Sequence, residues 1–223
     1  MVIKTLINVI IYAHHLNMKF YLSSSGLGNK AKELIRLMPQ NKKMGYIPNA
    51  CDYTNVDTNR RNEVNKSDIA ELRNLGLDVE FLDLKDYFGK VNKLRKKING
   101  LGGVFVRGGN TFILRQSMRL SGFDIIFKEI LERDDFVYAG YSAGICVLAP
   151  NFKALQIVDD PMDNPYKGQE TIWEGLGYLD YIILPHYKSN HPESADIDRE
   201  IEYCKKNKIL FKTLKDGEVI IIK

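Results

Sequence analysis

One segment of the sequence, residues 140–144, has the pattern glycine-x-serine-x-glycine and centres on Ser142. An apolar run, 136–139, precedes it and another, 145–148, follows it, which predicts a strand, a tight turn and a buried helix. A serine on such a turn projects its hydroxyl beyond the sheet, and the first amides of the helix face an incoming oxyanion. Ser142 is therefore a candidate nucleophile; the alternative is a tight packing turn that contains a serine. Cys146, inside the second apolar run, is interpreted as a small core residue.

A serine nucleophile needs a base, and histidine is the usual base near neutral pH. The sequence has 4 histidines, and two of them, His14 and His15, lie in the first seventeen residues. His186 directly follows the apolar run 181–185, so we expect it at the carboxyl end of a strand, where open α/β sheets place their sites. Its alternative role is a hydrogen-bonded structural histidine. His191 follows a polar loop and precedes a proline, which is typical of a surface or substrate-facing histidine.

The imidazole in turn needs a carboxylate that fixes its tautomer and stabilises its charged form. Asp216 lies in a Lys-Asp-Gly turn between two late strands and is the first candidate for this role. The alternative for Asp216 is an exposed aspartate that favours the turn geometry. Its rivals for the role are Glu218, Asp159 and Asp160.

A second glycine-containing turn supplies candidate donors for an oxyanion. Residues 107–110, Arg-Gly-Gly-Asn, leave a predicted strand and enter a helix, so their amides can approach a substrate without an intervening side chain. By itself a Gly-Gly turn is more often a simple loop. Four polar residues are candidates for substrate binding, and each is equally readable as a polar loop residue: Arg107, Asn110, Asp159 and Tyr187.

Taken together, these segments resemble the dipeptidase E (aspartyl dipeptidase) family of serine peptidases, which has cyanophycinase-like relatives. The resemblance covers the chain from about Met18 to the C-terminus, and the matching segments are 103–112, 140–144, 184–187 and 214–217. The resemblance implies an α/β fold, a three-layer sandwich with a largely parallel central sheet, similar to class I glutamine amidotransferase domains.

The same resemblance implies roles for individual residues. It implies a nucleophile, a base, an acid and two oxyanion amides at Ser142, His186, Asp216, Gly109 and Ala143, respectively. Family members often have glutamate at the position of the acid. Two departures from the family pattern are Arg107, in place of a further glycine, and the irregular segment around Asp159. These departures concern the implied specificity for aspartyl substrates more than the implied hydrolytic activity.

The rest of the chain must position these residues. Its pattern alternates short apolar runs with helical stretches, as in a parallel sheet covered by helices. We predict strands at 19–22, 44–47, 78–82, 103–106, 136–139, 181–184, 209–211 and 219–222. We predict helices near 30–37, 67–75, 87–98, 111–120, 124–133 and 195–206. Residues 149–177, with several prolines and glycines, predict a long irregular excursion, and such segments are often functional.

No repeat, low-complexity tract or long linker divides the sequence, so we interpret residues 18–223 as a single domain and residues 1–17 as an N-terminal extension. The apolar run in that extension is interrupted by Asn8 and is far shorter than the roughly 20 residues of a membrane span. It also lacks a small-residue cleavage site after it, which disfavours a signal peptide. Three cysteines without a CxxC pair fit a reducing compartment, so we expect a cytoplasmic protein.

The composition excludes several classes of protein. Of 223 residues, 44% are hydrophobic and 27% are charged, which is typical of soluble globular chains rather than disordered or membrane proteins. The chain has 32 basic and 28 acidic residues, and the net charge of +4 is too small to indicate nucleic acid. The densest basic cluster, 90–97, has apolar residues at helical spacing and predicts an amphipathic helix with a solvated basic face.

The leading hypothesis is a serine hydrolase, specifically a dipeptidase or small-peptide exopeptidase, that acts through an acyl-enzyme on Ser142 without a metal or cofactor. Ordinary α/β-hydrolases have the order serine, acid, histidine, whereas this chain offers Ser142, His186 and Asp216, and it has no HExxH metallopeptidase motif. The alternatives are a catalytically silent small-molecule-binding homologue and a hydrolase of aspartate-rich polymer. The expected partner is a small peptide, and a homodimer is an open alternative to a monomer.

Overall fold

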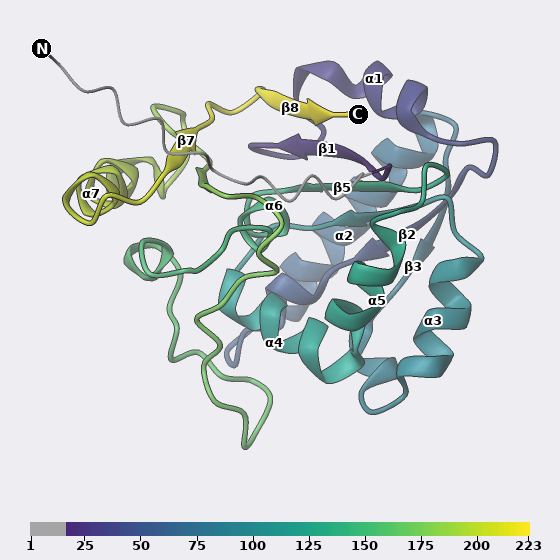
Figure 1. Ribbon diagram of the computed structural model, residues 1–223, viewed down its shortest axis with the longest axis horizontal. Helices are drawn as coiled ribbons and strands as arrows, with labels where there is room; N and C mark the ends of the chain where they lie inside the picture. The colour runs from purple at the N-terminus through teal and green to yellow at the C-terminus, as the bar shows by residue number, and fades with distance from the viewer. Residues whose placement is uncertain (1–16) are drawn as a thin grey trace, which may run out of the picture.

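The computed structural model describes residues 17–223, and a six-stranded sheet lies at its centre (Figure 1). Its strands are β1 (Lys19–Ser23), β2 (Lys43–Ile47), β3 (Asp78–Phe81), β4 (Gly103–Val106), β5 (Val137–Tyr141) and β8 (Val219–Ile222). They follow the order β3-β2-β4-β5-β1-β8, in which all pairs are parallel except β1 with β8. The predicted, largely parallel central sheet is confirmed.

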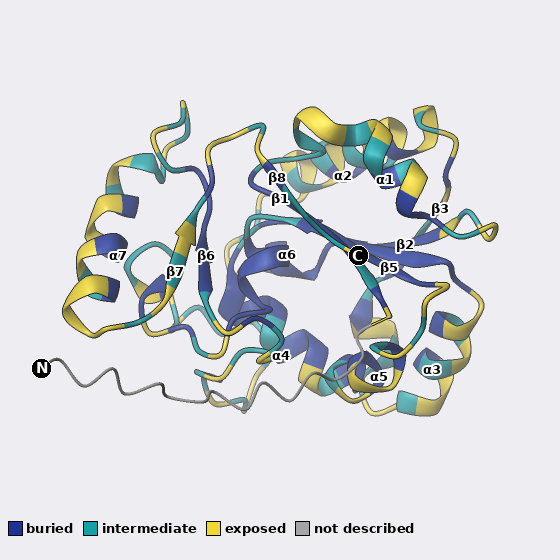
Figure 2. Cartoon of the chain, turned by 45° about the horizontal axis from the view of Figure 1, so that its top comes forward, coloured by how far each residue is buried: buried dark blue, intermediate teal, exposed yellow. Residues whose placement is uncertain are grey.

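Helices cover both faces of this sheet. They are α1 (Ala31–Leu37), α2 (Thr58–Asn74), α3 (Val91–Asn99), α4 (Thr111–Ser121), α5 (Phe123–Ile130) and the short α6 (Ala143–Cys146). Successive strand residues face opposite sides, so the sheet has a core on each face. Tyr46 and Phe105 belong to the core cluster that includes residues of α1 and α2, whereas Val104 and Tyr138 belong to the cluster that includes residues of the other helices. Figure 2 shows α1 and α2 on one side of the sheet and α3, α4 and α5 on the other. This arrangement is the expected three-layer α/β sandwich.

The late strands depart from a simple continuation of the main sheet. The strands β6 (Ile182–Leu184) and β7 (Phe211–Thr213) pair in parallel as a separate two-stranded sheet. The helix α7 (Ser194–Lys206) connects them and lies beside them, apart from the main sheet (Figures 1 and 2). Because β8 pairs with the outer edge of β1, that edge is not free to accept β6. The carboxyl end of β6 therefore reaches the site from outside the six-stranded sheet.

Helix α2 begins earlier than the sequence pattern predicts. The sequence predicts a helix from about residue 67, whereas α2 begins at Thr58 and includes most of the polar residues 54–66 that precede the predicted start. Asp57 caps the helix because its carboxylate accepts hydrogen bonds from two amides of the first turn. Few side chains of α2 are buried, so the helix lacks the apolar periodicity that would identify it. The earlier start places Arg60 and Arg61 in its first turn.

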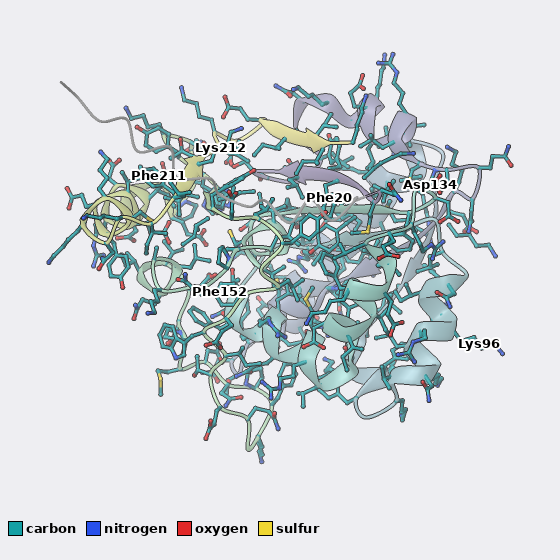
Figure 3. All side chains as sticks on the ribbon, in the orientation of Figure 1. Phe20, Lys96, Asp134, Phe152, Phe211 and Lys212 are labelled. Carbon is teal, nitrogen blue, oxygen red and sulfur yellow. The ribbon has the colours of Figure 1, made fainter. Side chains whose placement is uncertain are left out.

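Residues 149–177 follow the irregular course that their composition predicts. Their only regular features are a 3₁₀ turn, η4 (Leu155–Ile157), and an isolated bridge between Asn151 and Glu174. Phe152, labelled in Figure 3, is buried and meets the ring of Phe112 edge-on, with centroids 5.5 Å apart. An aromatic contact of this kind anchors the segment to α4.

The basic cluster forms an amphipathic helix, as predicted. In α3, Leu94 and Ile98 are buried, whereas Lys96 is exposed and projects outward (Figure 3). The predicted extension, residues 1–17, lies outside the described residues apart from Asn17. None of the helices in residues 17–223 is both long and apolar enough to cross a membrane.

Candidate active site

Ser142 occupies a sharp turn between β5 and α6, in a backbone conformation that is rare for a residue with a side chain. Its φ is 49° and its ψ is −121°. The turn is held from two sides. The Ser142 amide donates to the Ser24 carbonyl at 3.2 Å, and Gly144 lies so close to β4 that an added Cβ would be 2.2 Å from the Val106 carbonyl oxygen. The predicted strand, turn and helix are therefore present, with glycine required after the serine.

His186 and Asp216 form a hydrogen-bonded pair next to this turn. His186 Nδ1 lies 2.7 Å from Asp216 Oδ1, and the imidazole is almost fully buried. The pairing of β6 with β7 sets the two residues side by side, since His186 follows β6 and Asp216 follows β7. An ionised carboxylate only accepts, so Nδ1 carries the proton and Nε2 has a free lone pair. This is the arrangement that a general base requires.

Ser24 links all three of these residues, although no motif in the sequence marks it. Its hydroxyl donates to Asp216 Oδ1 at 2.9 Å and accepts from the His186 amide at 2.9 Å. Its carbonyl accepts from the Ser142 amide. Ser24 directly follows β1, and nothing in its serine-rich loop distinguishes it from Ser25 before the fold is known.

The three rival acids do not contact His186. Glu218 Oε2 accepts from the Lys215 amide at 2.8 Å and thereby closes the turn that carries Asp216. The carboxylates of Asp159 and Asp160 accept from the amides of Thr111 and Met162, respectively. Of these four acids, Asp216 is thus the one whose carboxylate hydrogen-bonds to the imidazole.

A cavity of about 450 Å³ opens beside Ser142 and His186. Its other lining residues are Ser25, Cys51, Tyr53, Asn55, Val56, Asp57, Arg60, Arg61, Arg107, Gly108, Gly109, Tyr141, His191 and Glu193. Within residues 17–223, no hydrogen bond joins the Ser142 hydroxyl to His186. Such catalytic hydrogen bonds often tighten only when substrate binds, so the shared cavity is the relevant observation.

The Gly-Gly turn after β4 lies against Ser142. A Cβ added to Gly108 would be 2.8 Å from the Cβ of Ser142, and Gly109 has a φ of 146°, which favours glycine. Neither the Gly109 amide nor the Ala143 amide donates to another group among the described residues. Both amides are therefore available to an oxygen atom bound next to Ser142.

The four candidate substrate-binding residues divide into two groups. Arg107 lines the cavity, and its guanidinium is held by Asn65 Oδ1 at 2.6 Å. Asn110, Asp159 and Tyr187 do not line it. The Asn110 side chain instead caps α4, because its Oδ1 accepts from two amides of the first turn.

His191 and Glu193 lie directly over the catalytic histidine candidate. The rings of His186 and His191 stack with centroids 3.7 Å apart, and Glu193 Oε2 lies 3.9 Å from His186 Nε2. Burial and the neighbouring His191 lower the pKa of His186, although Asp216 acts in the opposite direction. Burial, and to a lesser extent Asp216, raises the pKa of Glu193. In the sequence, nothing marks Glu193 as a site residue except its position two residues after His191.

The cysteines do not supply a second nucleophile. Cys51 lines the cavity, but its Sγ lies 3.1 Å from the Gly108 carbonyl oxygen and burial raises the pKa of the thiol. Cys146 is buried in α6 as predicted, and burial raises its pKa well above the ordinary value. Cys204 is also buried and unpaired.

Comparison with known proteins identifies the family. The sequence pattern of peptidase family S51, the dipeptidase E family, matches residues 20–223. An uncharacterized peptidase of Listeria monocytogenes is 34% identical over 158 residues, which are 68% of this chain and 70% of that protein. An uncharacterized peptidase of Pasteurella multocida is 27% identical over 157 residues, which are 69% of this chain and 68% of that protein.

Two solved structures share the fold. A candidate peptidase E protein from Listeria monocytogenes matches 92% of this chain and 98% of its own, with a TM-score of 0.70 and 22% identity. A peptidase from an acI-B1 Actinobacterium matches 92% of this chain and 83% of its own, with a TM-score of 0.62 and 16% identity. Since the family pattern also spans nearly all of the described residues, the chain belongs to peptidase family S51 and is a serine-type peptidase.

Proposed function

We propose that the protein is a dipeptidase or small-peptide exopeptidase that acts through an acyl-enzyme on Ser142. The observation that carries this proposal is the hydrogen bond of Asp216 to His186, which lines the same cavity as Ser142. The strained turn at Ser142 supports the same role, because it exposes the hydroxyl at the start of α6. The buried, unpaired cysteines fit a reducing compartment, so we include a cytoplasmic location in the proposal.

In the proposed reaction, His186 Nε2 takes the proton of the Ser142 hydroxyl while Oγ attacks the carbonyl carbon of the scissile bond. The Asp216 carboxylate stabilises the imidazolium that forms. The amides of Gly109 and Ala143 donate to the resulting oxyanion. The imidazolium then protonates the leaving amine, and the C–N bond breaks to give the acyl-enzyme. Water, deprotonated by His186, releases the acid and restores the Ser142 hydroxyl.

The charges that line the cavity favour a short peptide with free ends. Arg60, Arg61 and Arg107 contribute cationic groups, whereas Asp57 and Glu193 contribute carboxyl groups. A dipeptide carries an ammonium group and a carboxylate only a few bonds from its scissile carbonyl. A cavity of about 450 Å³ that holds groups of both signs can pair with both termini at once. A long polypeptide can bring at most one of its termini to the reacting bond.

A fluorophosphonate probe and a dipeptide library test the proposal together. The probe should label the wild type and should not label Ser142→Ala. Ser121→Ala, which removes a hydroxyl bonded within α4, should be labelled like the wild type. Free dipeptides should be cleaved at least tenfold faster than the same sequences with an acetylated N-terminus or an amidated C-terminus.

Each alternative gives a different result in the same assays. Absence of labelling and turnover, with thermal stabilisation by a small ligand, would indicate a silent binding protein. Equal rates on free and blocked substrates would contradict an exopeptidase. Faster cleavage of an aspartate-rich polymer than of any dipeptide would replace the proposed substrate class.

A further inference from the structure

We propose that His186, His191 and Glu193 form a binding site for a divalent transition-metal ion such as Zn²⁺, and that the bound ion inhibits the peptidase. One ligand atom from each residue lies within 4.8 Å of the others. The ion would occupy the cavity rather than serve as a cofactor. The binding site stands on its own, whereas the inhibition rests on the proposed function.

Three potential ligand atoms, two imidazole nitrogens and a carboxylate oxygen, lie close together here. His186 Nδ1 is occupied by Asp216, so Nε2 bears the lone pair that faces Glu193 Oε2 at 3.9 Å. His191 Nδ1 accepts from the Glu193 amide at 3.3 Å and also lies 3.9 Å from Glu193 Oε2. All three atoms are therefore near enough to bind one ion. A cation there would satisfy His186 Nε2 and Glu193 Oε2, and it would replace the Glu193 amide as the partner of His191 Nδ1.

The surroundings of His186 match what a metal-bound histidine requires. Metal-ligating histidines usually donate their second ring N–H to a carboxylate, which fixes the tautomer and raises the basicity of the ligating nitrogen. Asp216 does this for His186 at 2.7 Å. The hydrogen bond that prepares His186 as a base therefore prepares it equally as a ligand.

The geometry allows the ligands to close around an ion. Zinc–nitrogen bonds of about 2.0–2.1 Å in a tetrahedral site place ligand atoms about 3.3 Å apart. The separations of 3.9 Å from Glu193 Oε2 to His186 Nε2 and to His191 Nδ1 thus need to shorten by about 0.6 Å, and the two histidine nitrogens, now within 4.8 Å of each other, must approach to the same distance. The His186 side chain is 3% exposed and stays fixed, whereas those of His191 and Glu193 are 29% and 39% exposed and can turn. Because the two rings now stack, the ring of His191 must tilt for its Nδ1 to face the ion.

The donor set selects the class of metal. Imidazole nitrogens suit zinc and its neighbours in the first transition series, whereas magnesium and calcium prefer oxygen ligands. An ion on Nε2 removes the lone pair that must take the Ser142 proton. Metal binding and proton abstraction by His186 therefore exclude each other.

Metal binding is tested first without any activity measurement. Metal-free Ser142→Ala protein should take up one Zn²⁺ by calorimetry, and Co²⁺ should give the intense visible absorption of a four-coordinate site. Glu193→Gln and His191→Gln should each weaken this binding at least tenfold. Glu202→Gln, an exposed acid on α7, serves as the matched control and should bind like the parent. Binding that is equal in all variants, or absent from the parent, would overturn the metal site.

Inhibition is then measured on active protein with a dipeptide that it cleaves. Micromolar Zn²⁺ should lower the rate, millimolar Mg²⁺ should not, and EDTA should restore it. In Glu193→Gln and His191→Gln, the zinc concentration for half-inhibition should rise at least tenfold relative to each variant's own uninhibited rate. Unchanged sensitivity in both variants would overturn the inhibitory role. If no dipeptide is cleaved, the proposed function fails, while the calorimetry still decides the metal site.

Discussion

The Ser24 hydroxyl donates to Asp216 Oδ1 at 2.9 Å, the same oxygen that receives the His186 hydrogen bond. Ser24 also accepts from the His186 amide. One side chain thus fixes both members of the pair relative to each other. Because Ser24 is fully buried and does not line the cavity, we regard it as a positioning residue.

Ser24→Ala should therefore lower kcat about 10- to 100-fold and leave KM within about threefold, as expected when the geometry of a base is loosened. The loss of two buried hydrogen bonds should reduce the free energy of unfolding by about 1–3 kcal/mol. Steady-state kinetics and urea unfolding measure the two effects. Ser121→Ala, which removes a buried hydroxyl within α4, is the control that should leave kcat unchanged. A Ser24→Ala enzyme with a fully retained kcat would contradict the positioning role.

Asp216→Asn should be much more damaging. The amide cannot stabilise an imidazolium and favours the wrong tautomer of His186, so kcat should fall about 10³- to 10⁴-fold. Glu218→Gln provides the matched control, because among the described residues the Glu218 side chain accepts only from the Lys215 amide in the same turn. Its kcat should stay within a few-fold of the wild type, as measured with the best dipeptide substrate. The reverse order of the two effects would assign the acid to Glu218.

The sequence was informative about this site where the chemistry depends on backbone shape. Two features of the sequence predict turns at strand ends without a structure. They are the glycines around Ser142 and the apolar runs before Ser142 and His186. The parallel sheet follows from the same alternation of strands and helices. The sequence favours Asp216 among the candidate acids, but its pairing with His186 depends on how β6 lies against β7.

Other parts of the site could not be read from the sequence because they depend on contacts between distant segments. Ser24 is separated from Asp216 by 192 residues and matters only because β1 lies next to β5 and β8. Arg60 and Arg61 belong to α2, which buries few side chains and therefore lacks the apolar periodicity that would predict a helix there. Conversely, Asn110 is a candidate for substrate binding in the sequence, but in the structure its side chain caps α4.

The pH dependence of kcat/KM should reveal the environment of His186. Its pKa lies below the ordinary value of 6.5, so the neutral, basic form persists to lower pH. The rate should rise with pH, reach half its maximum below pH 6.5 and be level at neutrality. His191→Ala removes a neighbouring cationic form and admits water to the ring, and both changes raise the pKa of His186. The acidic limb of the profile should therefore move to higher pH in this variant, and an unmoved limb would contradict the coupling.

Glu200, on the inner face of α7, should make the stability of the protein depend on pH. Its side chain is buried and its Oε2 has no partner among the described residues. Burial, and to a lesser extent the nearby Asp159, raises its pKa to about 9 from an ordinary value of 4.5. Between these two values the folded protein holds a proton that the unfolded chain releases. Glu200 therefore lowers the free energy of unfolding by about 1.4 kcal/mol for each pH unit gained in that window.

Glu200→Gln keeps the shape of the side chain and removes the titration. Relative to the wild type, its free energy of unfolding should gain about 1.4 kcal/mol per pH unit between about pH 6 and 8. Urea unfolding at pH 6, 7 and 8 measures this difference. Glu202→Gln, at an exposed position on the same helix, should give a curve parallel to the wild type. If the Glu200→Gln curve is also parallel to that of the wild type, Glu200 is ionised in the folded protein. Its side chain is then more accessible to water than the structure shows.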